Sequence, residues 1–333
     1  MKIKNNFFAR VISLCLLLTL VVMSGVGAIT VSAAEPIESN NVATLLTATS
    51  KDNSTFASKN LITNEETYYN LYSEGKMIDL SEEAEIAALN SSNVTSKSNS
   101  AYFPSFATAT PAPTEEDTRS IIGTDSRTRV TNTTTYPYSA ICHITISWPD
   151  GATSVGTAWM YWEDVAITAG HCVYSADHGG WATSIAVRPG ANESYSPYGT
   201  VYSTTIHTAT KWIDEANWEY DYGVIELSSD IGNSTGWFGT SWTLWTLLGT
   251  DITVTGYPGE YTREMWQMSG EVTTSRHRKV YYDLDTTGGQ SGSPVYKSDY
   301  QVIAIHAYGG TSENSGTRIT SALFDFFASF REE

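Results

Sequence analysis

The segment Gly-Gly-Gln-Ser-Gly-Ser-Pro at residues 288–294 places a serine between glycines. A serine hydroxyl is a weak nucleophile near its free pKa, so it needs a base within hydrogen-bond reach and donors for the oxyanion that its attack creates. Glycines around Ser291 permit a tight turn in which the N–H groups of Gly289 and Ser291 point into one oxyanion hole. The segment therefore predicts a nucleophilic serine with its oxyanion hole.

A histidine and an aspartate precede this segment. His171 lies in Thr-Ala-Gly-His-Cys, directly after the β-run Val165–Thr168, and Asp221 begins the strand-like run Asp-Tyr-Gly-Val-Ile-Glu-Leu. In a catalytic triad the carboxylate fixes the tautomer of the histidine, which takes the serine proton and returns it to the leaving amine. Each residue alone has an ordinary structural explanation, but together they predict a triad of His171, Asp221 and Ser291.

The order of these residues excludes one other class of serine hydrolase. An α/β-hydrolase has the order Ser, acid, His, and its nucleophile elbow needs a glycine at the position that Ser293 occupies here.

Short runs rich in β-branched and aromatic residues, separated by Pro and Gly, follow one another from residue 140 onward. Such runs with turn residues between them are typical of strands. The predicted strands are 140–148, 154–161, 165–168, 184–188, 222–227, 251–256, 264–274, 279–284, 295–297, 302–307 and 316–320. Residues 321–331 carry an apolar stripe at helical spacing. The sequence therefore predicts an all-β fold, either sandwich or barrel, with a C-terminal helix.

The N-terminus has the pattern of a secretory signal. It has a basic start, an apolar run at Val11–Met23 and small residues at 32–34. The apolar run is shorter than the roughly 20 residues that span a bilayer, which argues against a transmembrane anchor. We expect residues 1–34 to be a signal peptide and the protein to be secreted and extracellular.

Residues 35–119 differ in composition from the rest of the chain. They are rich in Ser, Thr, Asn and Ala and contain no Cys or Trp, whereas all 10 tryptophans lie from Trp148 onward. This composition buries too little apolar surface to offset chain entropy on its own. We interpret the segment as a propeptide, with a disordered linker as the alternative, and expect the core in the C-terminal part.

Charge and motif content limit the possible partners. The chain has a formal net charge of −17, so we expect it to bind neither nucleic acid nor anionic membranes. It contains no HExxH, EF-hand or CxxC motif, and we predict no metal or other cofactor. The acidic cluster Asp214, Glu215 and Glu219 is either a solvated loop or a calcium site that adds stability.

These motifs, together with Gly-Tyr-Pro-Gly at 256–259 and Gly-Thr-Arg-Ile-Thr at 316–320, resemble the bacterial glutamyl endopeptidases, which are secreted relatives of trypsin and chymotrypsin. The resemblance also includes Ser-Ile-Ile-Gly at 120–123 and the run Arg127–Thr134, and it extends to the C-terminus.

The resemblance implies a domain arrangement. We expect two six-stranded antiparallel Greek-key barrels of the chymotrypsin type, with the cleft between them. The first barrel, residues 120–235, carries His171 and Asp221, and the second, residues 236–333, carries Ser291 and the C-terminal helix.

Substrate choice depends on three residues. Asp285 lies where trypsin-like enzymes carry the acid that receives Arg or Lys, but relatives specific for Glu also carry Asp there. In the glutamyl endopeptidases, the histidine at the position of His306 lines the specificity pocket and, with the threonine that corresponds to Thr286, receives the substrate carboxylate. A buried carboxylate needs such partners, because burying it unpaired costs several kcal/mol. The alternative for His306 is a neutral histidine packed in a strand.

The residue before the nucleophile, Gln290, points away from trypsin-type activation. Trypsin-like zymogens mature when a new N-terminal ammonium pairs with a buried acid at this position. Since Gln290 is neutral, an amine freed at Ser120 by cleavage after Arg119 is available elsewhere, and the resemblance places it near the specificity pocket as an extra positive charge.

Two cysteines remain after Cys15 leaves with the signal peptide. Relatives that bridge the cysteine after the catalytic histidine place its partner near Gly156. Here Cys142 would replace that partner from the neighbouring strand, since a hairpin centred on Asp150 sets it beside residues 157–159. We expect a disulfide between Cys142 and Cys172, with two buried free thiols as the alternative.

The resulting hypothesis is a secreted, monomeric serine endopeptidase, made as a zymogen with its own propeptide as a partner, that cleaves protein and peptide substrates after Glu and less readily after Asp. The alternatives are a trypsin-like protease that uses Asp285 to cleave after Arg or Lys, and a toxin-like or non-catalytic homologue whose cleft binds one target protein.

Overall fold

The computed structural model describes residues 43–48, 50–73, 76–77, 94–104, 125–310 and 312–331. Every described residue lies in one compact unit, 41–333. None of the helices in this described part is long and apolar enough to cross a membrane. The predicted signal peptide and the predicted mature N-terminus at Ser120 lie outside the described residues.

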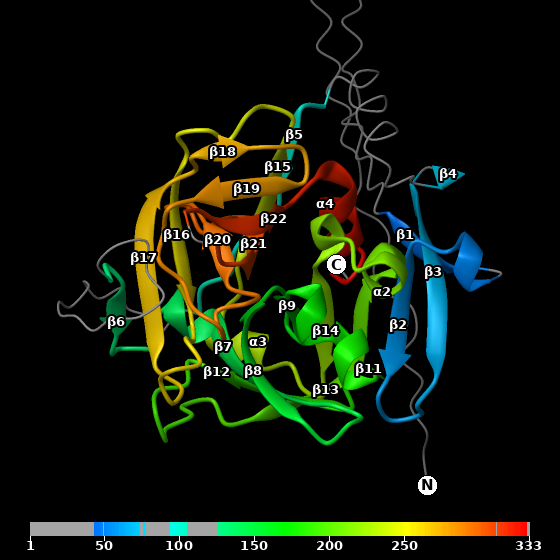
Figure 1. Ribbon diagram of the computed structural model, residues 1–333, viewed down its shortest axis with the longest axis horizontal. Coiled ribbons are helices and arrows are strands. Elements are labelled where there is room, and N and C mark those ends of the chain that lie inside the picture. The colour runs from blue at the N-terminus through cyan, green and yellow to red at the C-terminus, as the bar shows by residue number, and fades with distance from the viewer. Residues whose placement is uncertain are drawn as a thin grey trace, which may run out of the picture. The chain divides into compact units, whose positions relative to one another are not determined.

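Six antiparallel strands form a closed barrel, drawn in green in Figure 1. Its strands are β7 (Ile141–Ser147), β8 (Thr153–Met160), β9 (Val165–Thr168), β12 (Ser184–Pro189), β13 (Val201–Ala209) and β14 (Gly223–Leu227). Each strand pairs with the next in the order β12-β7-β8-β9-β14-β13, and β13 also pairs with β12, which closes the ring. Ile144, Trp159 and Ile225 are fully buried in its core.

The second barrel-like sheet, yellow to red in Figure 1 except for the green β6, has the order β18-β19-β22-β21-β20-β16-β17-β6. Its strands are β16 (Asp251–Gly256), β17 (Met265–Glu271), β18 (Thr274–Ser275), β19 (Lys279–Tyr282), β20 (Pro294–Tyr296), β21 (Gln301–Tyr308) and β22 (Asn314–Arg318). Val254, Val280 and Val295 belong to a hydrophobic cluster of its own. The predicted all-β fold of two chymotrypsin-like barrels is confirmed.

Two further strands join this second sheet, and one of them comes from the range predicted for the first barrel. β6 (Thr128–Val130) pairs with β17, so the segment that begins the predicted first domain belongs to the second sheet. β15 (Gly239–Thr243) pairs in parallel with β21. The N-terminal segment therefore crosses from one barrel to the other.

The predicted propeptide region contributes strands to both sheets. They are β1 (Thr44–Thr47), β2 (Phe56–Asn60), β3 (Glu66–Ser73), β4 (Lys76–Met77) and β5 (Ser96–Ser98). β2 pairs with β13 of the first barrel and β5 pairs with β15. β1, β3 and β4 pair with other strands of the same region. The composition did not predict these strands, because the region joins the barrels only through β2 and β5, whose partners lie far along the chain.

The predicted C-terminal helix is α4 (Ser321–Ala328). Thr320 caps it, since its hydroxyl accepts from the Leu323 N–H at 3.3 Å. Phe326 buries its ring against Phe56 of β2, with the ring centroids 3.8 Å apart. Shorter elements in the described part are α2 (Thr210–Glu215), α3 (Gly232–Thr235), β10 (Tyr174–Ser175), β11 (Gly180–Trp181) and the 3-10 turns Lys51–Asn53, Tyr138–Ala140, Gly170–Cys172, Ala176–His178 and Trp218–Tyr220.

Candidate active site

Two neighbouring strands bring His171 and Asp221 together. His171 lies in the 3-10 turn that follows β9, and Asp221 lies just before β14. β9 and β14 are antiparallel, with Thr168 opposite Gly223. The end of one strand therefore lies beside the start of the other, which is where both side chains occur.

Two hydrogen bonds join these residues. Oδ2 of Asp221 lies 2.8 Å from Nδ1 of His171, and Oδ1 accepts from the backbone N–H of His171 at 2.8 Å. Asp221 is fully buried, whereas the His171 side chain is 31% exposed. A carboxylate that accepts from Nδ1–H leaves Nε2 of the imidazole free to accept a proton.

Charge and burial act in opposite directions on this pair. Burial by itself would raise the pKa of Asp221, but the charge and hydrogen bonds of His171 hold that pKa below its usual value. Burial likewise opposes the imidazolium, yet Asp221 outweighs it and raises the pKa of His171 well above its usual value. The pair thus stabilises the imidazolium that general-base catalysis produces.

Gly170, just before His171, permits the close approach of the Asp221 carboxylate to His171. A Cβ at Gly170 would lie 2.9 Å from Oδ1 of Asp221 and 3.0 Å from Oγ1 of Thr208. A side chain there would push the carboxylate away from the imidazole.

Ser291 lies in the loop between β19 and β20, against the first barrel. Its carbonyl accepts from the N–H of Thr157 in β8 at 2.9 Å, and the Cys172 sulfur lies 3.9 Å from the same oxygen. Gly292 has a φ of +90°, and a Cβ on it would lie 2.3 Å from Oγ1 of Thr168. The loop therefore brings Ser291 to the turn that carries His171.

The N–H groups predicted for the oxyanion hole are not used in the loop. Within the described chain, neither Gly289 nor Ser291 donates its N–H to a protein acceptor. The Gly289 carbonyl, in contrast, accepts from the Thr157 hydroxyl at 3.0 Å, and the Gly288 carbonyl accepts from the Gly259 N–H at 2.6 Å. Fixed carbonyls and free N–H groups are what an oxyanion hole requires.

His306 in β21 is bound directly to the nucleophile loop. Its N–H donates to the Ser293 carbonyl at 2.9 Å, and its carbonyl accepts from the Gly292 N–H at 2.7 Å. The imidazole is 2% exposed, and its Nδ1 lies 2.7 Å from the Tyr282 hydroxyl. Burial, aided by the charges of His171 and Lys279, lowers the pKa of His306 to about 3. At neutral pH the ring is therefore uncharged.

The two residues before this loop have different surroundings. Thr286 is 3% exposed, and among the described residues no hydrogen bond joins it to His306. Asp285 is 2% exposed, and its Oδ2 accepts from the backbone N–H of Ser126 at 2.9 Å. The carboxylate of Asp285 thus binds the N-terminal segment. The third predicted pocket residue, Ser120, lies outside the described residues.

The predicted disulfide between Cys142 and Cys172 is wrong, since both cysteines are buried free thiols. Cys142 does pair with Ala158 on the adjacent strand, as the hairpin argument required. The Cys172 sulfur, however, lies 3.1 Å from the Cβ position of Gly156, which is opposite Ile144. The Cys172 sulfur, which comes from the turn after β9, therefore lies beside a different step of the β7–β8 ladder from Cys142.

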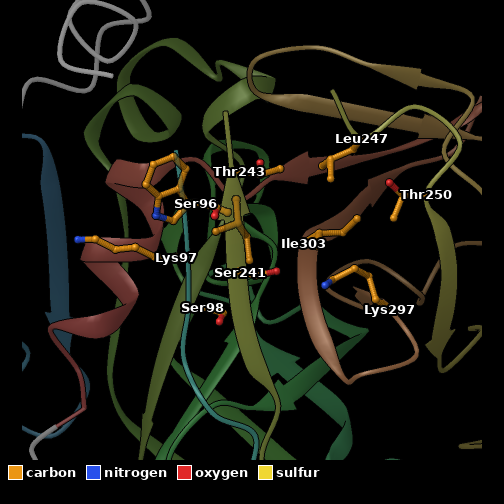
Figure 2. A pocket seen from close by; sticks show the side chains of 11 residues that line it. Ser96, Lys97, Ser98, Ser241, Thr243, Leu247, Thr250, Lys297 and Ile303 are labelled. Atoms are coloured by element: carbon orange, nitrogen blue, oxygen red, sulfur yellow. The ribbon is translucent and has the colours of Figure 1, made fainter. Parts of the chain in front are cut away.

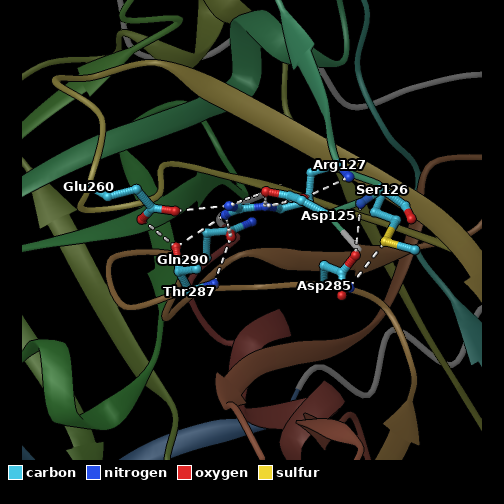
Figure 3. Close-up of polar contacts among 8 residues, drawn as sticks. Asp125, Ser126, Arg127, Glu260, Asp285, Thr287 and Gln290 are labelled. Atoms are coloured by element: carbon cyan, nitrogen blue, oxygen red, sulfur yellow. Dashed lines mark hydrogen bonds and ion pairs between the residues drawn. The ribbon is translucent and has the colours of Figure 1, made fainter. Parts of the chain in front are cut away.

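A buried arginine next to the nucleophile loop was missed. Arg127 binds the side chain of Gln290, and it also contacts Asp125, Thr287 and Glu260 (Figure 3). The sequence offered one signal, because Arg127 lies in a run that the glutamyl endopeptidases share. Its partners could not be identified from spacing, since three of them lie more than 130 positions away.

Other parts of the described chain hold cavities and acidic residues. A cavity of about 480 Å³ beside the paired strands β5 and β15 is lined by Lys97, Trp242 and Lys297 among others and contains none of the predicted site residues (Figure 2). No group of three or more His, Cys, Asp or Glu in this part is placed to hold a metal ion. In the acidic cluster, Asp214 instead pairs with Lys51 at 2.5 Å.

Comparison with known proteins finds a family model and relatives that are all named as proteases or peptidases. The model of the trypsin-like peptidase domain matches residues 156–305, which include His171, Asp221 and Ser291. The chain is 44% identical over 229 residues to a glutamyl endopeptidase of Bacillus licheniformis, covering 65% of this chain and 70% of that protein. It is 41% identical over 213 residues to a Bacillus subtilis protein named extracellular metalloprotease, covering 62% of this chain and 68% of that protein.

Among solved structures, a Glu endopeptidase in complex with MPD is similar to this chain with a TM-score of 0.58 and 31% sequence identity. The match covers 64% of this chain and 100% of that chain.

Proposed function

The chain belongs to the glutamyl endopeptidase family of trypsin-like serine proteases, and we propose that it hydrolyses peptide bonds on the carboxyl side of glutamate with His171, Asp221 and Ser291. It is a serine endopeptidase, and its substrates are proteins or peptides. The observation that supports the catalytic assignment best is the doubly hydrogen-bonded pair of His171 and Asp221 beside the Ser291 loop.

In the proposed acylation step, Nε2 of His171 takes the proton of Ser291 while Oγ attacks the scissile carbonyl carbon. The oxygen that gains negative charge is held by the N–H groups of Gly289 and Ser291. His171 then gives its proton to the nitrogen of the leaving amine as the carbon–nitrogen bond breaks. The product is an ester between Ser291 and the acyl half of the substrate.

In deacylation a water molecule takes the place of the amine. His171 removes a proton from the water as its oxygen attacks the ester carbon, and it returns the proton to Oγ of Ser291 when the ester breaks. Asp221 stays ionised throughout, since its pKa is held below its usual value. A free carboxylate product and the original enzyme result.

We assign the acidic specificity to His306 and Thr286. Because the pKa of His306 is lowered to about 3, the uncharged imidazole acts as a hydrogen-bond donor when the Tyr282 hydroxyl donates to Nδ1 and leaves the proton on Nε2. An arriving carboxylate favours the charged form of the ring and raises its pKa. In this proposal the amine of Ser120 supplies a positive charge near the pocket.

Asp285 supports the same choice by exclusion of the basic alternative. A pocket for Arg or Lys needs a carboxylate free to accept from the substrate cation. The carboxylate of Asp285 already accepts from Ser126 and is 2% exposed.

We further propose that the protein is secreted as a monomeric zymogen, with residues 1–34 as signal peptide and 35–119 as propeptide. The pairing of β2 with β13 and of β5 with β15 supports a propeptide that docks on its own protease. The net charge of −17 argues against binding to nucleic acid or anionic membranes. No cofactor is part of the proposed reaction.

A peptide panel tests the assignment. The processed protein and its Ser291→Ala variant are incubated with peptides that carry Glu, Asp, Arg or Phe before a reporter group. We expect cleavage after Glu, weaker cleavage after Asp, and no turnover by the variant. Cleavage after Arg would instead support the trypsin-like alternative, and no cleavage of any peptide would support a homologue that binds a single target.

A further inference from the structure

The feature that carries a further inference is the Arg127 cluster, which we define as Asp125, Arg127, Glu260, Thr287 and Gln290 (Figure 3). Arg127 is on the N-terminal segment, just before β6, whereas Thr287 and Gln290 lie in the nucleophile loop. The guanidinium has no exposed side-chain surface. A buried cation of this kind is stable only when each of its donors has a partner.

The guanidinium divides its donors among Asp125 of its own segment, Glu260 between β16 and β17, and the nucleophile loop. Nε and Nη2 donate to the carboxylate of Asp125 at 3.0 and 2.8 Å, and Nη2 also reaches Glu260 at 2.9 Å. Nη1 donates to Oε1 of Gln290 at 3.0 Å and to the hydroxyl of Thr287 at 3.1 Å. Asp125 thus neutralises the positive charge of Arg127 and orients its planar guanidinium, while Nη1 binds the nucleophile loop.

Gln290 transmits this contact to the nucleophile. Its Oε1 also accepts from the Thr287 N–H at 2.9 Å, which fixes the side chain against its own loop. Its carbonyl accepts from the N–H and the hydroxyl of Ser293, at 3.0 and 2.6 Å. Ser291 and Gly292 lie between these anchors, and the N–H groups of Gly289 and Ser291 flank Gln290. The position of Gln290 therefore sets the direction of both N–H groups.

A second contact fastens the same two segments. The N–H of Ser126, beside Arg127, donates to the carboxylate of Asp285 at 2.9 Å. In trypsin-type activation, by contrast, a new terminal ammonium pairs with an acid at the position of Gln290. Here the cation comes from inside the chain and the loop supplies a neutral acceptor.

We propose that Arg127 is a positioning residue that holds the nucleophile loop in its reactive form through Gln290, and that it does so before the propeptide is removed. The inference rests on the proposed function for the identity of the nucleophile. Its second part follows from one observation. The Arg127 cluster is formed in the chain in which β5 of the propeptide is still paired with β15.

The first experiment compares Arg127→Met, Arg127→Lys and Arg129→Met in the processed enzyme. Arg129 is the matched control, because it lies two positions further on but is 29% exposed and pairs with surface carboxylates. Rates are expressed per active site titrated with a fluorophosphonate. We expect Arg127→Met to lower kcat by about 10²- to 10³-fold, the effect of losing an oxyanion donor, with KM changed less than about threefold.

Arg127→Lys keeps the charge but lacks the planar fork, so we expect an intermediate kcat. Arg129→Met should stay within about twofold of the parent protein, as is usual for an exposed ion pair. An unchanged kcat per titrated site in Arg127→Met, or a loss confined to KM, would overturn the positioning role.

Loss of Arg127 leaves Asp125 buried without its cation, and Arg127→Met can fail to fold for that reason. Gln290→Met then carries the test, since it removes the loop acceptor and leaves the ion pair of Arg127 with Asp125 in place. We expect about a tenfold or greater loss in kcat with a circular dichroism spectrum like that of the parent. A kcat equal to that of the parent would overturn the proposal.

The second experiment uses the uncleaved chain. Arg119→Ala blocks the predicted processing site, and intact mass confirms that the propeptide is present. We expect the fluorophosphonate to label Ser291 at a rate within about tenfold of the processed enzyme, because the loop is already positioned. A rate at least about a hundredfold lower would show that the new N-terminus is required.

These results separate the inference from the proposed function. Fluorophosphonate labelling does not depend on a glutamate side chain. If the peptide panel shows no preference for Glu, the Arg127 experiments still decide the positioning role; if Arg127→Met is fully active, the Glu assignment is unaffected.

Discussion

The two barrels position their parts of the active site in different ways. In the first barrel, adjacent strands β9 and β14 place His171 and Asp221 within direct hydrogen-bond contact. In the second, Ser291 lies on a loop whose anchors come from β8, from β21 and from the N-terminal segment. The acid and base are thus placed by strand pairing within one barrel, whereas the nucleophile depends on contacts from several other segments, which also include Gly259 and Glu260 between β16 and β17.

The chemistry of the two halves explains this difference. A buried carboxylate and imidazole satisfy each other, so their contact stabilises the site itself. An oxyanion hole must leave two N–H groups without partners until the substrate arrives, and unpaired backbone donors cost free energy. The loop must therefore be held through its carbonyls and side chains instead.

The largest expected effect on kcat comes from the His171–Asp221 pair of the first barrel. Asp221→Asn should lower kcat by about 10⁴-fold, because the amide stabilises the wrong tautomer of His171. Removing the carboxylate also removes the group that raises the pKa of His171, while burial continues to lower it. The acid limb of the residual activity should therefore move to lower pH in a kcat/KM profile. Asp214→Asn, a partly exposed surface change, is the control; a loss below about tenfold in Asp221→Asn would contradict the pairing as described.

The next prediction concerns Gly292 in the nucleophile loop of the second barrel. Gly292→Ala puts a methyl group 2.1 Å from the Thr157 carbonyl at a φ of +90°, so the loop must move away from β8. A displacement of about 1 Å costs about 10²-fold in kcat, and we expect at least that loss together with a lower melting temperature. Gly249→Ala is the matched control, because its φ is +73° but no atom lies within 4 Å of the new methyl.

If Gly249→Ala lowered kcat as much as Gly292→Ala does, backbone strain in general, and not the contact between the barrels, would explain the loss.

Substitution in the specificity region should be selective. His306→Gln removes the proposed donor to the substrate carboxylate, and we expect kcat/KM for Glu peptides to fall by about 10- to 100-fold relative to Phe peptides. His143→Gln is the control, since His143 is also a buried histidine whose pKa is lowered, to about 4, but lies in β7 of the first barrel. Equal losses for both peptides in His306→Gln would assign the histidine to loop support alone.

The smallest expected effect tests whether a covalent bond helps to hold the first barrel and the His171 turn together. Because Cys142 and Cys172 are free, a thiol reagent should titrate both in the denatured processed protein without prior reduction. Reductant should leave its melting temperature unchanged within about 1 °C, since there is no disulfide loop constraint to remove. A clear drop in melting temperature on reduction would instead support the predicted disulfide between Cys142 and Cys172.

Local patterns predicted strands of two kinds, the alternating run at 251–256 and the short, fully buried run at 165–168. The predicted runs 165–168 and 251–256 coincide with β9 and β16, and the helix predicted from residue 321 is α4. β13 was missed because Thr and Ser dilute its apolar alternation and because a register shift between Ser203 and Thr205 breaks the period of two.

By itself, the amino-acid sequence determined the class of chemistry and of fold. The order of His171, Asp221 and Ser291, the glycines near each of them and the short alternating runs are local properties, since they depend on which residue types can occupy a turn or a strand. Only the tertiary structure decided what depends on long-range contact. It paired strands of the predicted propeptide with the barrels, placed the Cys172 sulfur beside a different ladder step from Cys142 and buried Arg127 against Gln290. Such contacts join residues far apart in the chain, and no local pattern specifies which of them will meet when the barrels close.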